Sequence, residues 1–151
     1  MCSAIWGTRT GPPDRTVDHP SRFLRFFKVG DISVQGSLRA EDLARAGASL
    51  RGWVGRHWPG ATWRREWPLR RRLRDGSELH GFADLVLETR EGLVLIDHKC
   101  LGGTLTEAVA AAPSYGAQLA AYVDVLERAT GRDVLGRWLH MPLQGVCVEV
   151  R

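Results

Sequence analysis

Apolar residues recur along the chain with two different periods, and each period predicts a different type of element. From Ser37 to about residue 58 they recur every three or four positions, which favours an amphipathic helix with Ser37 as its N-cap. Pro59-Gly60 ends this helix. Over residues 61–73 apolar and charged side chains alternate, which predicts a long strand, and Pro68 within it indicates an edge strand or a bulge.

Two further apolar runs extend the alternating region into a three-stranded meander. Residues 79–88 and 93–100 are joined by a four-residue segment, 89–92, that is typical of a hairpin connection. After a loop that contains two glycines, Pro113 is predicted to open a second helix, which Gly131 closes. Two short strands are predicted at the end of the chain, over residues 134–141 and 146–150.

The order of these elements predicts the fold class. A helix, a meander of three strands, a second helix and two strands follow one another. The crossover through the second helix makes strand 134–141 parallel to strand 93–100, whereas the hairpins are antiparallel. The chain is therefore expected to form an α/β domain with a mixed sheet and helices on its faces.

Two carboxylates and one ammonium group lie at the ends of the most apolar strands. Asp97 and Lys99 are two residues apart in a strand and so share a face, and the hairpin can bring Asp84 beside them. Two close carboxylates repel each other unless a divalent cation lies between them. The first hypothesis is a metal-dependent hydrolytic site. The alternative is that these are solvated charges at the end of an exposed strand.

Composition narrows the class of protein. The chain has 151 residues, 44% of them hydrophobic and 25% charged, which is enough for one globular domain with a core. Its apolar stretches are too short to span a membrane, and three cysteines without a Cys-x-x-Cys pair argue against a disulfide framework or a zinc site. We therefore expect a cytoplasmic protein. The net charge of +4 allows an anionic partner.

Lysine is rare in this chain. Of the 21 basic residues only Lys28 and Lys99 are lysines, which sets the ammonium group of the Asp-x-Lys triplet apart. The first 35 residues also differ from the rest, because they contain several glycines and prolines and no sustained periodicity. This predicts a poorly ordered N-terminal extension over residues 1–35, with an exceptional apolar run at 23–27 that can dock on a domain at 36–151.

Three motifs in this order resemble a known family. Gly81-Phe82-Ala83-Asp84-Leu85-Val86, Ile96-Asp97-His98-Lys99 and Gln118-Leu119-Ala120-Ala121-Tyr122 together resemble the PD-(D/E)XK nuclease superfamily. They are most similar to the RecB-type C-terminal nuclease domain of bacterial helicase–nucleases (UvrD/AddA-like). The resemblance covers roughly residues 43–150 and implies a restriction-endonuclease-like αβββαβ core.

The resemblance implies a role for each matching residue. Asp84 and Asp97 would bind a divalent metal, Mg²⁺ or Mn²⁺, together with the backbone carbonyl of His98. Lys99 would orient or activate the attacking water. On the second helix, the residues expected to line the substrate groove share one face: Gln118, Tyr122 and Tyr115.

Two further candidates have two interpretations each. Glu66 matches a glutamate that the family often places near the metal, and its alternative is a salt bridge to the surrounding arginines. His57 lies on the apolar stripe of the first helix, where it is either a metal ligand or a core or capping residue. Six arginines on the first predicted strand and its turn form either a phosphate-tracking surface or a solvated edge: Arg64, Arg65, Arg70, Arg71, Arg72 and Arg74.

The resemblance thus implies a metal-dependent DNA nuclease, an exonuclease of double-strand break repair and recombination that acts on linear single- or double-stranded DNA. The chain has no Gly-x-x-x-x-Gly-Lys-Ser/Thr motif and so is not itself an ATP-driven motor. A helicase is expected either as a separate partner protein or as a missing upstream domain. The alternative is a catalytically silent module of the same fold that binds nucleic acid or docks on a partner.

Overall fold

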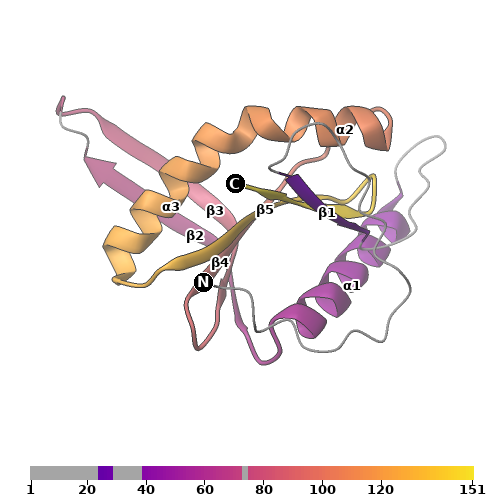
Figure 1. Cartoon of the computed structure of the whole chain (residues 1–151), viewed down its shortest axis with the longest axis horizontal. Helices are drawn as coiled ribbons and strands as arrows, with labels where there is room; N and C mark the ends of the chain where they lie inside the picture. The colour runs from indigo at the N-terminus through magenta and orange to yellow at the C-terminus, as the bar shows by residue number, and fades with distance from the viewer. Residues whose placement is uncertain (1–23, 29–38, 73–74) are drawn as a thin grey trace.

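The computed structural model of the chain describes residues 24–28, 39–72 and 75–151, and in these residues six strands form one sheet. The strands are β1 Leu24–Lys28, β2 Thr62–Arg72, β3 Glu78–Glu88, β4 Leu93–His98, β5 Val134–Met141 and β6 Val146–Val150. They lie in the order β1-β6-β5-β4-β3-β2 (Figure 1). Only β4 and β5 are parallel among the neighbouring pairs of this described sheet. The predicted α/β fold with a mixed sheet is confirmed.

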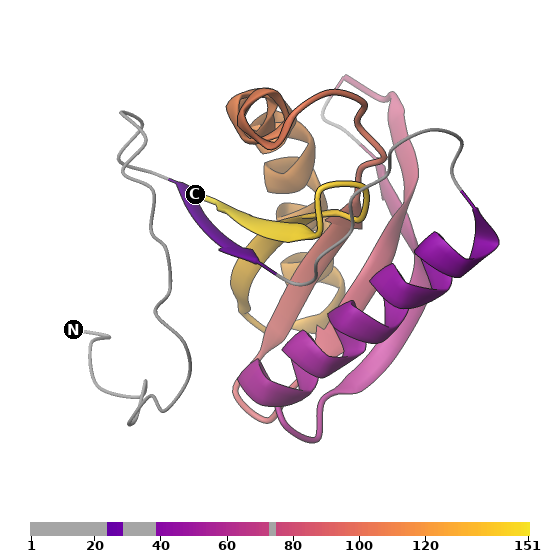
Figure 2. The same ribbon diagram turned by 90° about the vertical axis from the view of Figure 1, so that its right-hand side faces the viewer.

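Helices cover both faces of the sheet. The helix α1 Ala40–His57 lies on one face, and α2 Leu105–Ala111, the 3-10 helix η1 Ala112–Tyr115 and α3 Gly116–Thr130 lie on the other (Figures 1 and 2). Within the residues that the structure describes, no helix combines the length and the apolar character needed to cross a membrane.

Each face of the central strand β4 belongs to a different hydrophobic core. Leu93 and Leu95 are buried in the core shared with α2 and α3, whereas Val94 and Ile96 are buried in the core shared with α1. This explains why the strand is apolar at consecutive positions rather than at alternate ones. Because both faces are packed, the polar end of β4 is held in a fixed position.

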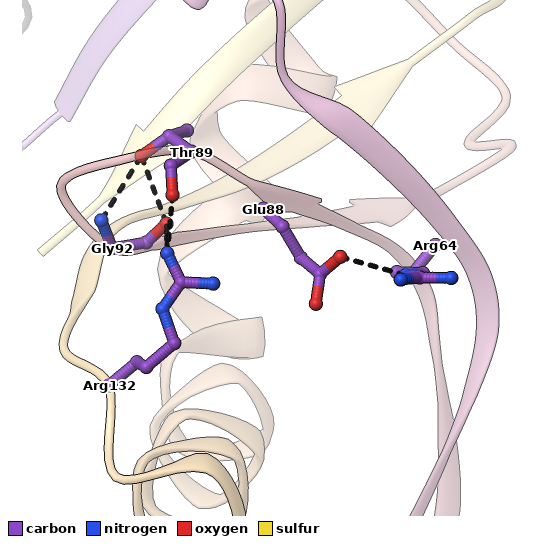
Figure 3. A network of polar contacts seen from close by, with 5 residues as sticks. All are labelled: Arg64, Glu88, Thr89, Gly92 and Arg132. Carbon is purple, nitrogen blue, oxygen red and sulfur yellow. Dashed lines mark hydrogen bonds and ion pairs between the residues drawn. The ribbon is translucent and has the colours of Figure 1, made fainter.

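A side chain from the loop after α3 fixes the turn between β3 and β4 (Figure 3). Nη2 of Arg132 donates hydrogen bonds to the backbone oxygens of Thr89 and Gly92. The Thr89 hydroxyl also donates to the oxygen of Gly92 at 2.9 Å and accepts from its N–H at 3.1 Å. Beside the turn, Arg64 Nε donates to Glu88 Oε2 at 2.8 Å and joins β2 to the end of β3. These bonds hold the meander in register.

The hairpin of β2 and β3 extends beyond its neighbour β4. The ladder between β3 and β4 covers only Leu85 to Glu88 of β3, whereas β3 pairs with β2 over both halves. Residues 67–72 and 78–83 therefore project as a two-stranded ribbon (Figure 1), which we call the outer ribbon. Since β2 is the edge strand of the sheet, the position of Pro68 agrees with the predicted edge.

The strand β2 changes the face that it presents at Glu66. In a regular strand, Arg65 and Trp67 would point to the same side. Here Arg65 lines a pocket beside α1, and Trp67 packs on the core beneath α3. Glu66 between them has φ 50°, in the left-handed region. The partner strand changes face at the same level, since Ala83 and Leu85 belong to opposite cores.

The second helical segment begins earlier than predicted. It starts at Leu105 rather than Pro113, because Thr104 forms a capping box with Glu107. The Thr104 hydroxyl accepts from the Glu107 N–H at 3.3 Å, and the Glu107 carboxylate accepts from the Thr104 N–H at 2.7 Å. Pro113 lies in η1 instead. The predicted end is confirmed, since Gly131 caps α3 with φ 66°.

The N-terminal region also departs from the prediction. The helix α1 begins at Ala40 with Arg39 as its N-cap, and Ser37 lies outside the described residues. Within the predicted extension 1–35, Leu24–Lys28 forms β1 and pairs with β6 along its length. The structure thus adds one strand from that range to the sheet. The remainder, residues 1–23 and 29–35, lies outside the described residues.

Candidate active site

The ends of β3 and β4 bring two carboxylates and one ammonium group together. The ladder between the two strands ends at the pair Leu85–Ile96, and Asp84 directly precedes Leu85 while Asp97 directly follows Ile96. Asp84 Oδ2 accepts a hydrogen bond from the backbone N–H of His98 at 2.7 Å. Asp97 Oδ2 lies 2.8 Å from Nζ of Lys99. The structure therefore assembles the three side chains on which the sequence hypothesis depended.

The environment of Asp97 opposes its ionisation. The residue is only 2% exposed. Burial raises the pKa of its carboxyl group, and the charge of Asp84 raises it further, while the hydrogen bond and the charge of Lys99 act in the opposite direction. A second cation beside Asp97 would offset the two unfavourable contributions.

Lys99 is held as a cation. Burial alone would lower the pKa of its ammonium group, but the hydrogen bond and the charge of Asp97, together with the charge of Asp84, raise it above its ordinary value. Nζ also lies 4.9 Å from the ring centroid of Tyr115, within the range of a cation–π contact. Lys99 therefore presents a fixed positive charge beside the carboxylates.

The donor atoms at this point suit a hard divalent cation. Two carboxylates and the backbone carbonyl of His98 are oxygen ligands, which Mg²⁺ and Mn²⁺ prefer. In the described part of the chain, no three side chains of His, Cys, Asp or Glu form a metal-binding group. Mg²⁺ commonly uses one or two carboxylates and keeps several waters. Asp84 and Asp97 therefore fit the ion that the fold implies.

The predicted substrate-groove residues lie on the same side of the sheet as Lys99. Gln118 Nε2 donates to the hydroxyl oxygen of Tyr122 at 3.0 Å. That hydroxyl approaches the backbone of Gly81 so closely that a Cβ atom there would lie 3.2 Å from it. The absence of a side chain at Gly81 thus lets α3 approach β3 three residues before Asp84. Tyr115 is partly buried and packs on the same core as Tyr122.

Glu66 lies directly across the hairpin from Asp84. The register pairs Arg65 with Leu85 on one side of it and Trp67 with Ala83 on the other. Among the described residues, Glu66 is the only non-glycine residue with a positive φ. A strained backbone beside polar groups is typical of functional sites. The metal or water-positioning role of Glu66 stays a prediction, as does the alternative of a salt bridge to the surrounding arginines.

Glu66→Gly is expected to be more stable than Glu66→Ala, because glycine adopts the left-handed conformation without the clash of a Cβ atom. The expected difference in the free energy of unfolding is about 1 kcal/mol, measured by urea denaturation. The same two substitutions at Arg70 of the same strand are the control, since alanine should be the more stable there by roughly 0.5–1 kcal/mol. Alanine proving more stable at both positions would contradict strain at Glu66.

A pocket of about 400 Å³ opens between α1 and the sheet beside Asp84. Its polar lining comes from five elements: Arg51, Arg65, Glu66, Asp84, His98 and His140. Asp97 and Lys99 do not line it, because their side chains lie on the side of the sheet that α3 covers. Asp84 is therefore the carboxylate that the pocket and the Asp97–Lys99 pair share.

No role was predicted for His140 from the sequence, but the structure places this residue in the pocket. His140 and His98 are ladder partners of the parallel pair β4–β5, and their Nδ1 atoms are 3.0 Å apart. Burial lowers the pKa of His140 to about 3 and also lowers the pKa of His98. Both rings are therefore neutral near pH 7, and one donates to the other. The predicted parallel pairing of these strands was the signal that could have placed them side by side.

The structure does not bring His57 to the carboxylates. It lies in the last turn of α1, with Nδ1 2.9 Å from the backbone oxygen of Trp53. Its ring contacts the rings of Trp53 and Trp58, with centroids 4.9 and 5.8 Å away. The α1 residues that line the pocket end earlier, at Arg51. A metal-binding role for His57 stays a prediction that this arrangement does not support.

The arginines of β2 divide between ion pairs and exposed positions. Arg64 pairs with Glu88, and Arg71 pairs with Asp124 of α3. Arg74 lies outside the described residues. The other three are exposed on the surface: Arg65, Arg70 and Arg72.

Comparisons with known proteins agree with this geometry. A sequence model described as the PD-(D/E)XK nuclease superfamily matches residues 13–150. A relative from Alkaliphilus oremlandii (strain OhILAs), named as a subunit of an ATP-dependent helicase/nuclease, is 36% identical over 72 residues. That match covers 46% of this chain and 6% of the relative's length. The family match, which covers most of the chain, shows that this protein belongs to the PD-(D/E)XK nuclease superfamily.

Proposed function

We propose that this chain is a divalent-metal-dependent DNA nuclease domain of RecB type that hydrolyses phosphodiester bonds. The observation that carries the proposal is the convergence of Asp84, Asp97 and Lys99 where β3 leaves β4. Membership of the nuclease superfamily supports it. A module that only binds nucleic acid would need neither two adjacent carboxylates nor a buried ion pair.

The residues of the chain divide the chemistry between them. Asp84, Asp97 and the carbonyl of His98 would hold Mg²⁺ or Mn²⁺. When bound, such an ion supplies a more acidic water and neutralises charge on the phosphate. Lys99 places a permanent positive charge where negative charge develops on the phosphate oxygens, and it orients the attacking water. Both functions require the fixed geometry that the packed end of β4 provides.

The face of α3 next to β3 would bind the substrate strand. The hydroxyl of Tyr122 accepts from Gln118, so its own proton remains available to donate to a phosphate or sugar oxygen. Tyr115 packs against Lys99 and keeps its ammonium group in place. These contacts lie on the side of the sheet where Asp97 and Lys99 face α3.

The biological setting is proposed from the relative. That protein is named as part of a helicase/nuclease, and the match covers a small fraction of it. We propose that this domain works as an exonuclease on linear DNA in double-strand break repair, either joined to a helicase or beside one in the cytoplasm. Cleavage of a linear single-stranded oligonucleotide in Mg²⁺ or Mn²⁺, and its loss in EDTA, tests the nuclease activity directly. Binding without cleavage in both metals would favour the silent module instead.

The stability of the metal-free protein is expected to fall as pH rises through the pKa of Asp97. Because that pKa is raised above the ordinary value for an aspartate, the folded protein binds the proton more tightly than the unfolded chain does. Denaturation in EDTA at a series of pH values measures the effect. Asp97→Asn cannot ionise and should remove it. Saturating Mg²⁺ should reverse the trend, because the ion binds the deprotonated form.

Asp75 is the matched control for this titration. Its pKa is lowered by hydrogen bonds from Ser77, so its contribution to stability has the opposite sign and is lost as pH falls. Asp75→Asn should therefore leave the dependence at higher pH unchanged. An identical pH profile for wild type and Asp97→Asn in EDTA would contradict the assignment.

A further inference from the structure

The outer ribbon has one packed face and one exposed face. The positions that face α3 and the core are all at least partly buried, and the positions between them are all exposed. The exposed face consists of three cross-strand pairs: Pro68 with Phe82, Arg70 with His80, and Arg72 with Glu78. The exposed face ends at the level of Glu66 and Asp84, where both strands change face, and therefore lies next to the candidate active site.

Phe82 is the most exposed large apolar side chain in the described residues. It is 58% exposed, although burial of its ring would be favourable. Its partner across the hairpin, Pro68, is also exposed, and the two form an apolar step. Phe82 lies two residues before Asp84, roughly 7 Å away along the strand. A ring in this position can stack on a flat group next to the carboxylates.

Positive charge accompanies this apolar step. Arg70 and Arg72 are exposed, and neither pairs with a carboxylate among the residues that the structure describes. Arg70 Nε instead donates to Nδ1 of His80 at 3.3 Å, while Nε2 of His80 contacts Glu78 at 2.7 Å. The guanidinium groups therefore remain available to an anion, at a spacing of two residues along the strand.

We propose that the exposed face of the outer ribbon, which points away from α3, binds single-stranded DNA outside the groove beside α3 and guides it toward Asp84, with one base stacked on Phe82 and the phosphates beside Arg70 and Arg72. Aromatic side chains on which bases stack, set in positively charged surroundings, are the usual means of binding single strands without sequence preference. Duplex DNA fits less well, because its bases already stack on one another at about 3.4 Å and offer no free face. This inference rests on the proposed function and adds the form of the substrate.

Binding of labelled oligonucleotides in EDTA, followed by fluorescence anisotropy, tests the proposal without cleavage. Phe82→Ala should weaken binding of a single-stranded oligonucleotide by roughly 5–150-fold, the loss expected for one stacked base. Phe82→Trp should retain it. Phe82→Ala should weaken the binding of a blunt duplex of equal length much less. Leu135→Ala, at a residue that is 50% exposed on β5, is the matched control and should change neither.

The arginines are tested by salt dependence. Removing Arg70 and Arg72 together should lower the slope of log K against log salt by roughly 0.7 for each lost phosphate contact. Arg90→Ala, at an exposed arginine in the β3–β4 turn, should leave the slope unchanged. Equal losses for Phe82→Ala and Leu135→Ala, or equal losses on single strands and duplexes, would overturn the proposal.

The two proposals fail in different ways. If wild type cleaves DNA in Mg²⁺ while binding is insensitive to Phe82, the single-strand surface is wrong and the nuclease function stands. If binding depends on Phe82 and no metal supports cleavage, the surface stands and the nuclease function is wrong.

Discussion

Asp97→Asn is expected to lower the rate of DNA cleavage at least about a thousandfold, because a metal ion contributes several kcal/mol to such reactions and each interval of about 1.36 kcal/mol is a factor of ten. Asparagine keeps the shape of the side chain and removes its charge. The ion would then lose one of two carboxylate ligands, and Lys99 would lose the partner at 2.8 Å that orients it. Single-turnover cleavage of a linear oligonucleotide at saturating Mg²⁺ measures the effect.

The fold should survive this substitution. In the metal-free protein the Asp97 carboxylate is buried beside Asp84, and removing its charge relieves that repulsion. Thermal unfolding in EDTA should therefore show a variant as stable as wild type or more stable. Asp75→Asn removes an exposed carboxylate at the β2–β3 turn and should cleave normally. Cleavage by Asp97→Asn at the rate of the Asp75 variant would remove the basis of the proposed site.

Lys99→Met is expected to lower the rate of cleavage by roughly 10²–10³-fold, the loss typical of one group that stabilises charge in a transition state. Methionine keeps the length of the side chain and its contact with the ring of Tyr115, but it carries no charge. The carboxylates remain, so Mn²⁺ should still bind. Comparing the cleavage rate with Mn²⁺ affinity from calorimetry separates the two properties.

Arg90→Met is the control for loss of a positive charge, because Arg90 is exposed in the β3–β4 turn. It should bind metal and cleave DNA as wild type does. Lys99→Arg tests the geometry, since a planar guanidinium does not replace a compact ammonium group in a confined site. Loss of Mn²⁺ binding in Lys99→Met would assign Lys99 to holding the carboxylates rather than to the reaction.

The strands and the motifs at residues 81–86 and 96–99 were predictable because they depend on local sequence. Apolar runs interrupted by short polar turns predicted the meander, and the two-residue period placed Asp97 and Lys99 on one face. The parallel pair β4–β5 followed from the crossover alone. The start of α2 was missed because Thr104 and Glu107 form a capping box in a stretch that two glycines made resemble a loop.

The parts of the site that depend on tertiary structure were not predicted. The left-handed conformation of Glu66 has no sequence signal, because a glutamate in an alternating run is expected to continue the strand. If β2 alternated regularly through Glu66, the side chains on one half of the hairpin would be assigned to the wrong face of the sheet. The contact between His98 and His140 joins residues 42 positions apart and depends on the register of a parallel pair.

The separation of β4 from β5 along the chain bears on the order in which the protein folds. The β3–β4 hairpin joins strands that are adjacent in sequence through a four-residue turn, to which Arg132 adds hydrogen bonds from the loop after α3, whereas β5 joins β4 across the whole intervening helical segment. A nascent or refolding chain can therefore bring Asp84 and Asp97 together before β5 has joined the sheet. At that stage Lys99 lacks the hydrogen bond from its backbone N–H to the oxygen of His140 on β5. Catalytic competence should consequently arise late, at the step that completes the sheet.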